Sequence, residues 1–352
     1  MQIISDIPDI LPELCVATIG FFDGVHAGHR FLIEQVKEVA TARGIRSALI
    51  TFPVHPRKVM KTDYRPELLT TLDEKTALLS ETGVDYCIML DFTPAVSQLT
   101  AREFMTDILK ERYRVEALVI GYDHRFGHNR SEGFEEYRRY GEAIGMQVIL
   151  ARAYIYNDLH ISSSAIRDYL HLGDVSMANR CLGYDYFLDG IVVGGYQVGR
   201  KIGFPTANLN VDDPDKLIPA DGVYAVHVSF DGRIYAGMLN IGHRPTLDNG
   251  MNRSIEVHIL HFHSDIYDKF IRISFVQRIR SEMKFDGIDA LIEQLHKGCG
   301  NCRGIIAVTI VILLFFWTFS YMIGAGFFCL LYFLLYFINR PLIGRRVLNR
   351  SS

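Results

Sequence analysis

Apolar and polar positions along residues 14–180 switch repeatedly between a strand-like and a helix-like pattern. Residues 14–21 form a short apolar run rich in strand-forming side chains, and residues 30–43 carry apolar side chains at helical spacing before Gly44. The same alternation predicts strands at 47–52, 86–91, 117–121 and 147–151, and helices at 75–82, 101–112 and 133–144. Strands that alternate with helices form a parallel sheet covered on both faces, so we predict a Rossmann-like α/β domain over residues 1–182. We expect its ligand crevice beyond the carboxyl ends of the strands.

The pattern changes after Phe187. Short apolar runs at 190–193, 222–229, 234–241, 254–260 and 270–275 are separated by Gly, Asp, Pro and Asn. Runs of this length and spacing are typical of a small antiparallel β-barrel or sandwich. Residues 286–296 have the pattern of a closing helix. We therefore predict a second, β-rich domain over residues 183–296.

Residues 297–352 form a third part with a different composition. Residues 305–338 hold no charged side chain, and about 20 apolar residues are enough for a transmembrane helix. Two interpretations of this hydrophobic tail are open: a membrane segment at 305–338, or a non-functional extension such as a shifted reading frame or gene boundary would produce. The Cys-x-x-Cys motif of Cys299 and Cys302 has no second ligand pair and is interpreted as incidental.

Composition excludes several classes of protein. The chain has 352 residues, of which 49% are hydrophobic and 22% charged, so it is neither disordered nor collagen-like. The net charge is −3, but six of the 37 basic residues and none of the 40 acidic residues lie in 297–352. The acidic body that remains is a poor candidate for nucleic-acid binding. Six cysteines do not make a disulfide scaffold, and the N-terminus has no signal-peptide pattern. We predict a cytoplasmic protein, membrane-associated if the tail is an anchor.

The first candidate site lies where the first predicted strand passes into the first predicted helix. Residues 20–29 read Gly-Phe-Phe-Asp-Gly-Val-His-Ala-Gly-His. Gly24 and Gly28 allow a ligand to approach the backbone closely, and the helix that follows offers its N–H groups to an anion. The imidazoles of His26 and His29 can donate hydrogen bonds to phosphate oxygens, although turn and cap residues or a metal pair would have the same spacing. The motif predicts a nucleotide site.

A second segment is consistent with this prediction. Ser162, Ser163 and Ser164 precede a predicted helical stretch, and Arg167 follows one turn later. Hydroxyls, N–H groups at a helix start and a guanidinium together form a polyphosphate cradle. A plain serine N-cap is the alternative, and the pairing with the histidine motif favours the cradle.

The β-rich domain contains another candidate site in the run from Gly203 to Asn208. Thr206 and Asn208 carry oxygens that suit a hard cation or a phosphate, and Pro205 fixes the turn. Glu256 alternates with apolar neighbours, so a strand would place it on the polar face. An ordinary exposed glutamate is the alternative interpretation of Glu256.

In these motifs the chain resembles the bacterial bifunctional riboflavin kinase/FAD synthetase (FMN adenylyltransferase) family. Further segments carry the resemblance: residues 51–57, 72–75 and 121–127 in the first half, and residues 219–224, 240–246, 256–260 and 265–267 in the second. In segment 121–127 the family often has Phe where this chain has His124. The resemblance covers about residues 14–296.

The resemblance implies that the first domain is a nucleotidyltransferase that joins AMP from ATP to FMN and releases pyrophosphate. By position, His26 and His29 would stabilise the phosphate under attack, and Arg167 would hold the outgoing pyrophosphate together with the three serines. The positions implied to bind nucleotide are Gly20, Asp23, Gly24, Gly28, Asp123, Ser162, Ser163 and Ser164.

For the second domain the resemblance implies a six-stranded β-barrel that phosphorylates riboflavin. Gly203, Thr206 and Asn208 would bind ATP phosphates, and the last two would also hold Mg²⁺. Glu256 would accept the proton of the ribityl hydroxyl. The residues on the flavin side would be Arg280 and Glu282. ATP is then the co-substrate of both reactions, FMN the product of one and substrate of the other, and FAD the final product; the oligomeric state is left open.

Two functions from different classes fit these features. One is a bifunctional enzyme of flavin cofactor biosynthesis with a dispensable tail. The other is a membrane-anchored flavin- and nucleotide-binding protein in which one or both activities are reduced. The first is favoured because the full set of catalytic and phosphate-binding candidates is present: His26, His29, Arg167, Thr206, Asn208 and Glu256.

Overall fold

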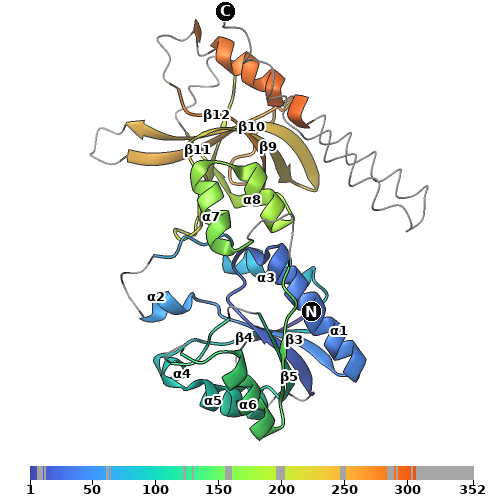
Figure 1. The fold of residues 1–352 in the computed structure, drawn as a ribbon. Coiled ribbons are helices and arrows are strands. Elements are labelled where there is room, and N and C mark those ends of the chain that lie inside the picture. The colour runs from blue at the N-terminus through green and yellow to red at the C-terminus, as the bar shows by residue number, and fades with distance from the viewer. Residues whose placement is uncertain are drawn as a thin grey trace, which may run out of the picture.

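Two bodies make up the computed structural model of this chain, an α/β domain and a β-barrel, with two helices between them (Figure 1). The structure describes residues 1–5, 11, 13–60, 63, 65–121, 124–128, 131–154, 161–195, 203–245, 251–283, 289–290, 292–302 and 304–306.

Six strands form one parallel sheet in the first domain. They are β1 (Gln2–Ser5), β2 (Cys15–Ile19), β3 (Arg46–Thr51), β4 (Tyr86–Met89), β5 (Val115–Ile120) and β6 (Gln147–Leu150). Their order in the sheet is β1-β4-β3-β2-β5-β6, and every pair is parallel. The predicted parallel sheet is therefore confirmed. The sequence analysis missed β1, because its four residues are mostly exposed and show no clear apolar pattern.

Helices cover both faces of this sheet. On one face α1 (Ala27–Arg43) and α3 (Leu72–Ser80) bury Ile33, Val36 and Leu78. On the other face lie α5 (Ala101–Glu103), η2 (Phe104–Arg112) and α6 (Phe134–Ile144). Short helices α2 (Pro56–Met60) and α4 (Pro94–Gln98) lie in the connections. The central strands β2, β3 and β5 are thus buried on both sides, as is usual in a parallel sheet, whereas the edge strands β1 and β6 are partly exposed.

Three predicted helices differ from the structure in detail. The first, predicted from residue 30, begins at Ala27 as α1. The helix predicted to begin at Lys75 begins at Leu72, because Thr71 and Glu74 form a capping box before it. Residues 101–112 were predicted as one helix, and the structure divides them into α5 and the π-helical stretch η2.

The strand order places a crevice at the carboxyl ends of β2 and β5. Strand β2 lies between β3, which follows it in the chain, and β5, which the chain reaches later. From β2 the chain adds β3 and β4 on one side and then returns to the other side of β2 as β5. The strand order therefore changes direction at β2, and ligands bind at such a switch point in open α/β sheets. The short 3₁₀ turn η1 (Asp23–Val25) and the start of α1 follow β2 at this edge.

Helices α7 (Ser163–Leu172) and α8 (Val175–Leu182) join the two bodies (Figure 1). Their side chains Ile166 and Val175 are buried in the same apolar cluster as Tyr224 and Phe275 of the barrel. The side chain of Asn179 also donates a hydrogen bond to the carbonyl oxygen of Phe275 at 2.8 Å. These helices therefore pack on the barrel, although the sequence analysis groups them with the α/β domain.

The second domain is a closed antiparallel barrel, so the barrel alternative is confirmed over the sandwich. Its strands are β7 (Phe187–Val193), β8 (Ala207–Asn210), β9 (Gly222–Phe230), β10 (Arg233–Pro245), β11 (Met251–Ile259) and β12 (Phe270–Arg280). They are joined in the order β10-β11-β8-β7-β12-β9. The sequence analysis missed β8 and treated it as part of a turn. Side chains such as Val226, Leu239 and Ile273 are buried in the apolar cluster shared with α7 and α8.

A C-terminal helix covers one outer face of the barrel. Residues 289–290, 292–302 and 304–306 are helical, so the predicted closing helix at 286–296 continues to residue 306. Cys299 and Cys302 are buried with Phe204 and Met238 in one apolar cluster. These cysteines therefore contribute to packing.

The hydrophobic tail is described only at its start. Within the part of the chain that the structure describes, no helix is both long and apolar enough to cross a membrane. The membrane segment predicted at 305–338 lies outside the described residues, apart from Ile305 and Ile306.

Candidate active sites

A cavity of about 550 Å³ opens at the carboxyl ends of β2 and β5, where the sequence predicts the ligand crevice. Gly20 and Gly121, which directly follow these two strands, both line it. Aromatic walls come from Phe21, Phe22 and Phe126. The predicted nucleotide-site residues that line the cavity are Gly20, Asp23, His29, Ser163, Ser164 and Arg167.

Asp23 and Arg167 form an ion pair in the cavity wall. Asp23 is 3% exposed, and its Oδ2 lies 2.6 Å from Nη2 of Arg167. Two backbone N–H groups, those of Leu69 and Thr70, donate to Oδ1 of the same carboxylate at 2.9 and 3.1 Å. Arg167 also donates from Nε to the carbonyl oxygen of Glu67 at 2.6 Å. The guanidinium is thus held on two sides, which fixes a positive charge at the cavity.

The structure gives the two motif histidines different surroundings. His26 caps α1: its Nδ1 accepts a hydrogen bond from the backbone N–H of His29 at 3.3 Å. The two rings stack with their centroids 3.6 Å apart. His29 lines the cavity, and its buried Nδ1 has no hydrogen-bond partner among the described residues. A buried polar atom without a partner is costly, so it indicates where a ligand would bind.

Burial keeps both imidazoles neutral near pH 7. Desolvation, together with the positive charge of Arg167, lowers the pKa of His26 to about 4. Burial, with His26 and Lys75 nearby, also lowers the pKa of His29 well below its usual value. A neutral imidazole retains one N–H donor and one acceptor nitrogen. The uncharged state suits the cap that His26 makes, since a protonated Nδ1 could not accept a hydrogen bond.

The three serines at the start of α7 divide between capping and the cavity. Ser162 is the N-cap, and its Oγ accepts from the N–H of Ala165 at 3.2 Å. Ser162 therefore has the N-cap role, and its contact with a nucleotide phosphate stays a prediction. Ser163 donates from Oγ to the carbonyl oxygen of Asp23 at 3.0 Å, and both Ser163 and Ser164 line the cavity.

The glycines of the motif act through packing. Gly24 has φ +75°, and a Cβ there would lie 2.8 Å from Cδ1 of Leu69. A Cβ on Gly28 would lie 3.3 Å from the ring of His26. Gly24 and Gly28 therefore bring the turn and the histidine ring into place and do not themselves line the cavity. Asp123, predicted to bind nucleotide, lies outside the described residues.

Two further residues at this site were quoted in the sequence analysis only as parts of longer segments. Lys75 is buried beneath Phe21 and donates from Nζ to the carbonyl oxygen of Phe52 at 2.8 Å. Burial lowers the pKa of Lys75 to about 8. His55 lines the cavity edge-on to Phe21, and burial lowers its pKa to about 4. The sequence signal for Lys75 was a lysine inside an apolar helical pattern.

The barrel brings Thr206, Asn208 and Glu256 together. Strand β11 pairs with β8 on one side and β10 on the other, so Glu256 lies directly opposite both Asn208 and Asn240. Directly opposed residues point to the same face of a sheet. Thr206 donates from Oγ1 to Oε2 of Glu256 at 3.2 Å. A smaller cavity of about 210 Å³ opens beside Thr206.

The alternation predicted for β11 is confirmed. Ile255, Val257 and Ile259 are buried in the barrel interior, whereas Glu256 and His258 are half-buried on the outer face. His258 makes a hydrogen bond with the carbonyl oxygen of Pro205 at 2.8 Å. This contact ties the 203–208 segment to the outer face that carries Glu256.

Three other residues of the barrel domain were predicted to bind a substrate: Gly203, Arg280 and Glu282. A Cβ on Gly242 would lie 2.3 Å from Oε1 of Glu282, so the Glu282 carboxylate lies against β10 two residues from Asn240. Arg280 ends β12, and burial lowers the pKa of its guanidinium. Gly203 has φ +82° and provides a left-handed turn.

Comparisons with known proteins assign each half of the chain to a family. Residues 10–165 match the FAD synthetase family, and residues 182–306 match the riboflavin kinase family. The second match ends where the described part of the C-terminal helix ends.

Relatives match along nearly their whole length. The chain is 36% identical to a bifunctional riboflavin kinase/FMN adenylyltransferase of Listeria monocytogenes over 293 residues, which is 83% of this chain and 92% of the relative. It is 37% identical to the protein of the same name from Escherichia coli K12 over 298 residues, 84% and 94% of the two chains. A crystal structure described as a macrolide-efflux protein from Streptococcus pneumoniae has a TM-score of 0.77 and 32% identity, covering 84% and 95%. The chain belongs to the family of bifunctional riboflavin kinases/FMN adenylyltransferases.

Proposed function

We propose that this chain phosphorylates riboflavin to FMN in its barrel and then transfers AMP from ATP to FMN in its α/β domain. The observation that carries the proposal is the presence of two separate polar sites, one in each of the domains that match the two families. The products of the second reaction are FAD and pyrophosphate. Both reactions use small molecules alone, in agreement with the acidic composition of the body.

Adenylyl transfer needs positioning and charge neutralisation rather than a covalent nucleophile. Arg167, fixed by Asp23, supplies a positive charge at the cavity for the outgoing pyrophosphate. Ser163, Ser164 and the N–H groups at the start of α7 lie beside it. His29 has a polar atom to offer to the phosphate under attack, and His26 holds that ring by stacking.

Riboflavin phosphorylation needs a base close to the nucleotide phosphates. Glu256 is the acid in the group with Thr206 and Asn208, and it lies on the outer face of the barrel. As a carboxylate it accepts the proton of the ribityl hydroxyl. We assign Glu282 and Arg280 to the flavin side of this site, because the Glu282 carboxylate lies against β10 at Gly242 and Arg280 ends β12.

The oxygen atoms of Thr206 and Asn208 suit Mg²⁺. Thr206 presents a hydroxyl and Asn208 an amide oxygen beside a carboxylate, and Mg²⁺ prefers such hard ligands with few protein groups. When bound, the ion would neutralise charge on the nucleotide phosphates. The described residues hold no group of three or more His, Cys, Asp or Glu side chains that could bind a metal. The proposed Mg²⁺ site differs from such a group because its neutral ligands come from Thr and Asn.

The direct test is to supply the purified full chain with riboflavin, ATP and Mg²⁺ and to separate the flavins by chromatography. We expect FMN to form first and FAD to follow. A chain that binds flavin and nucleotide without forming either product would contradict the proposal and would support the binding-protein alternative.

The first prediction concerns the α/β site. We expect His29→Ala to reduce FAD formation by about 10²–10³-fold, because a preorganised donor at the reacting phosphate is lost. Riboflavin phosphorylation stays near the parent rate, so FMN accumulates. Normal FAD output from this variant would remove His29 from the site.

The second prediction is the reciprocal one and serves as the control for the first. Glu256→Gln keeps the shape of the side chain and removes its basicity, so we expect FMN synthesis to fall by about 10²–10⁴-fold. FMN supplied from outside is still converted to FAD. A variant that phosphorylates riboflavin at the parent rate would show that Glu256 is an ordinary surface acid.

A further inference from the structure

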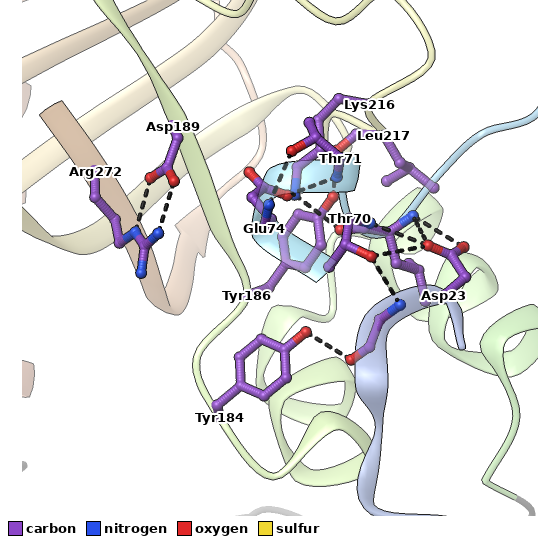
Figure 2. Close-up of polar contacts among 12 residues, drawn as sticks. Asp23, Thr70, Thr71, Glu74, Tyr184, Tyr186, Asp189, Lys216, Leu217 and Arg272 are labelled. Atoms are coloured by element: carbon purple, nitrogen blue, oxygen red, sulfur yellow. Dashed lines mark hydrogen bonds and ion pairs between the residues drawn. The ribbon is translucent and has the colours of Figure 1, made fainter. Parts of the chain in front are cut away.

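Residues 67–71 lie between the two domains and touch both (Figure 2). Leu68 forms an isolated parallel bridge with Lys216, a residue of the loop between β8 and β9. The N–H of Leu68 donates to the carbonyl oxygen of Asp215 at 2.7 Å, and the N–H of Leu217 donates to the carbonyl oxygen of Leu68 at 2.8 Å. The barrel therefore holds this segment of the α/β domain through its backbone.

The side chain of Lys216 adds a buried ion pair to this contact. It is 1% exposed, and its Nζ lies 2.5 Å from Oε2 of Glu74. The same ammonium donates to the carbonyl oxygen of Leu69 at 2.8 Å and lies over the ring of Tyr186 at 4.7 Å (Figure 2). Glu74 in turn accepts from the N–H of Thr71 at 2.9 Å. Lys216 thus fixes both ends of the short stretch from Leu69 to Thr71.

The opposite side of that stretch holds the adenylyl-transfer site. The N–H groups of Leu69 and Thr70 donate to the Asp23 carboxylate, and Oγ1 of Thr70 accepts from the N–H of Gly24 at 3.1 Å (Figure 2). Asp23 then holds Arg167 at 2.6 Å. One short segment therefore contacts Lys216 on one side and the Asp23–Arg167 pair on the other.

A single peptide group links the two sides. The carbonyl of Leu69, which accepts from Lys216, and the N–H of Thr70, which donates to Asp23 at 3.1 Å, belong to the same planar unit. Because that unit is rigid, a rotation that releases its carbonyl also turns its N–H away from Asp23. The direction of the Asp23 carboxylate is therefore coupled to a side chain of the other domain.

We propose that Lys216, a residue of the riboflavin kinase domain, is a positioning residue for FMN adenylylation. It holds the Leu69–Thr70 peptide, which orients Asp23, which in turn orients Arg167 toward the nucleotide phosphates. The inference rests on the proposed function of the α/β site. It gives the barrel a part in the reaction of the neighbouring domain, in addition to its own.

The test uses the full chain and measures both activities of each variant. Lys216→Met keeps the unbranched stem and removes the ammonium. Because this change leaves Glu74 buried without its cation, a second variant combines Lys216→Met with Glu74→Gln. We expect kcat/KM for ATP in adenylyl transfer to fall by between about tenfold and 10²-fold in both variants, since small misplacements at a reacting centre have effects of that size. We expect KM for FMN and the rate of riboflavin phosphorylation to stay within about twofold of the parent.

Two controls separate positioning from stability. Arg272→Met breaks the paired hydrogen bonds of Arg272 to Asp189, at 2.8 and 2.7 Å, within the barrel. We expect this variant to keep adenylyl transfer. The second control repeats Lys216→Met in an Arg167→Ala background, where the effect of Lys216 shrinks to about twofold or less if it acts through Arg167.

Several results would overturn the inference. Unchanged adenylyl transfer in both Lys216 variants would show that the peptide needs no support from the barrel. A parallel loss of both activities, an equal loss in the Arg167→Ala background, or failure of both variants to fold would show that the pair serves only the fold. A parent chain that makes no FAD from FMN and ATP would contradict the proposed function instead.

Discussion

Two histidines separated by two residues have different surroundings at the proposed adenylyl-transfer site. His26 uses Nδ1 to cap α1, whereas His29 keeps a buried Nδ1 without a partner among the described residues. The sequence pattern treats them alike, because both stand at the start of the same helix. The difference arises at the first turn of the helix, where His26 is the N-cap and Gly28 leaves room for its ring.

The environment of His26 predicts how stability depends on pH. Burial and the charge of Arg167 lower its pKa from 6.5 to about 4 in the folded chain. Between these values the unfolded chain binds a proton at His26 that the folded chain does not bind. The stability that neutral His26 contributes is therefore fully present above about pH 6.5 and is lost as the pH falls toward 4.

We expect His26→Asn to weaken this dependence. Asparagine keeps the N-cap and does not titrate, so the thermal midpoint of the variant falls less between about pH 7.5 and pH 5 than that of the parent. Part of the slope persists, because burial also lowers the pKa of His55 to about 4. Identical pH profiles for the two proteins would contradict this account of His26.

Residue types in the site could be predicted, but their pairings could not. The motifs indicated Asp23 and Arg167 separately, although they are 144 positions apart in the chain and form one ion pair. The partners of Asp23 come from residues 69–70, which carry no motif of their own. Such pairings depend on tertiary contacts that local spacing does not encode.

At the level of elements, apolar periodicity predicted the strands that are buried on one or both faces. Strand β11 is an example, because its alternation placed Glu256 on the outer face before the structure was known. Strand β8 was missed because it is short, follows Pro205 and carries two asparagines. Its place in the barrel is set by pairing with β11 and β7, which is a long-range property.

The first residue of a helix also depends on polar capping side chains, which the apolar pattern does not include. The capping box of Thr71 and Glu74 begins α3 three residues before its first predicted position. The same Glu74 reaches Lys216 of the barrel. Glu74 thus both caps the start of α3 and forms a contact between the domains. The cap is a local feature of the sequence, whereas the contact between domains forms only in the folded chain.

At the level of the whole molecule, the two domains contact each other more extensively than the sharp change of hydrophobic pattern near Phe187 indicates. Helix α7 lines the cavity of the α/β domain at its first turns, and both α7 and α8 pack against the barrel with their apolar side chains. Residues 67–71 add a second connection. FMN is the product of the first reaction and the substrate of the second, so both domains serve a single sequence of reactions.

The barrel also extends further along the chain than the composition break near residue 297 predicts. Cys302 is fully buried, Ile306 is 4% exposed, and a Cβ on Gly298 would lie 2.6 Å from Sδ of Met238. Burial of one isoleucine side chain contributes about 1.5–3 kcal/mol. We therefore propose that the kinase domain extends at least to residue 306, ten residues beyond the predicted boundary at 296.

A pair of truncations tests this boundary and the dispensability of the tail. A chain that ends at Ile306 keeps the buried part of the helix, so we expect it to convert riboflavin to FAD at a rate within about twofold of the full chain. A chain that ends at Lys297 loses Cys299, Cys302 and the partly buried Ile305 from the cluster with Met238, so we expect its thermal midpoint to fall by about 5 °C or more. Riboflavin phosphorylation, the activity of the barrel, is lost first as this shorter chain is warmed. Equal midpoints for the two truncations would place the boundary at 296 after all, and loss of either activity in the chain that ends at Ile306 would show that residues 307–352 belong to the catalytic fold.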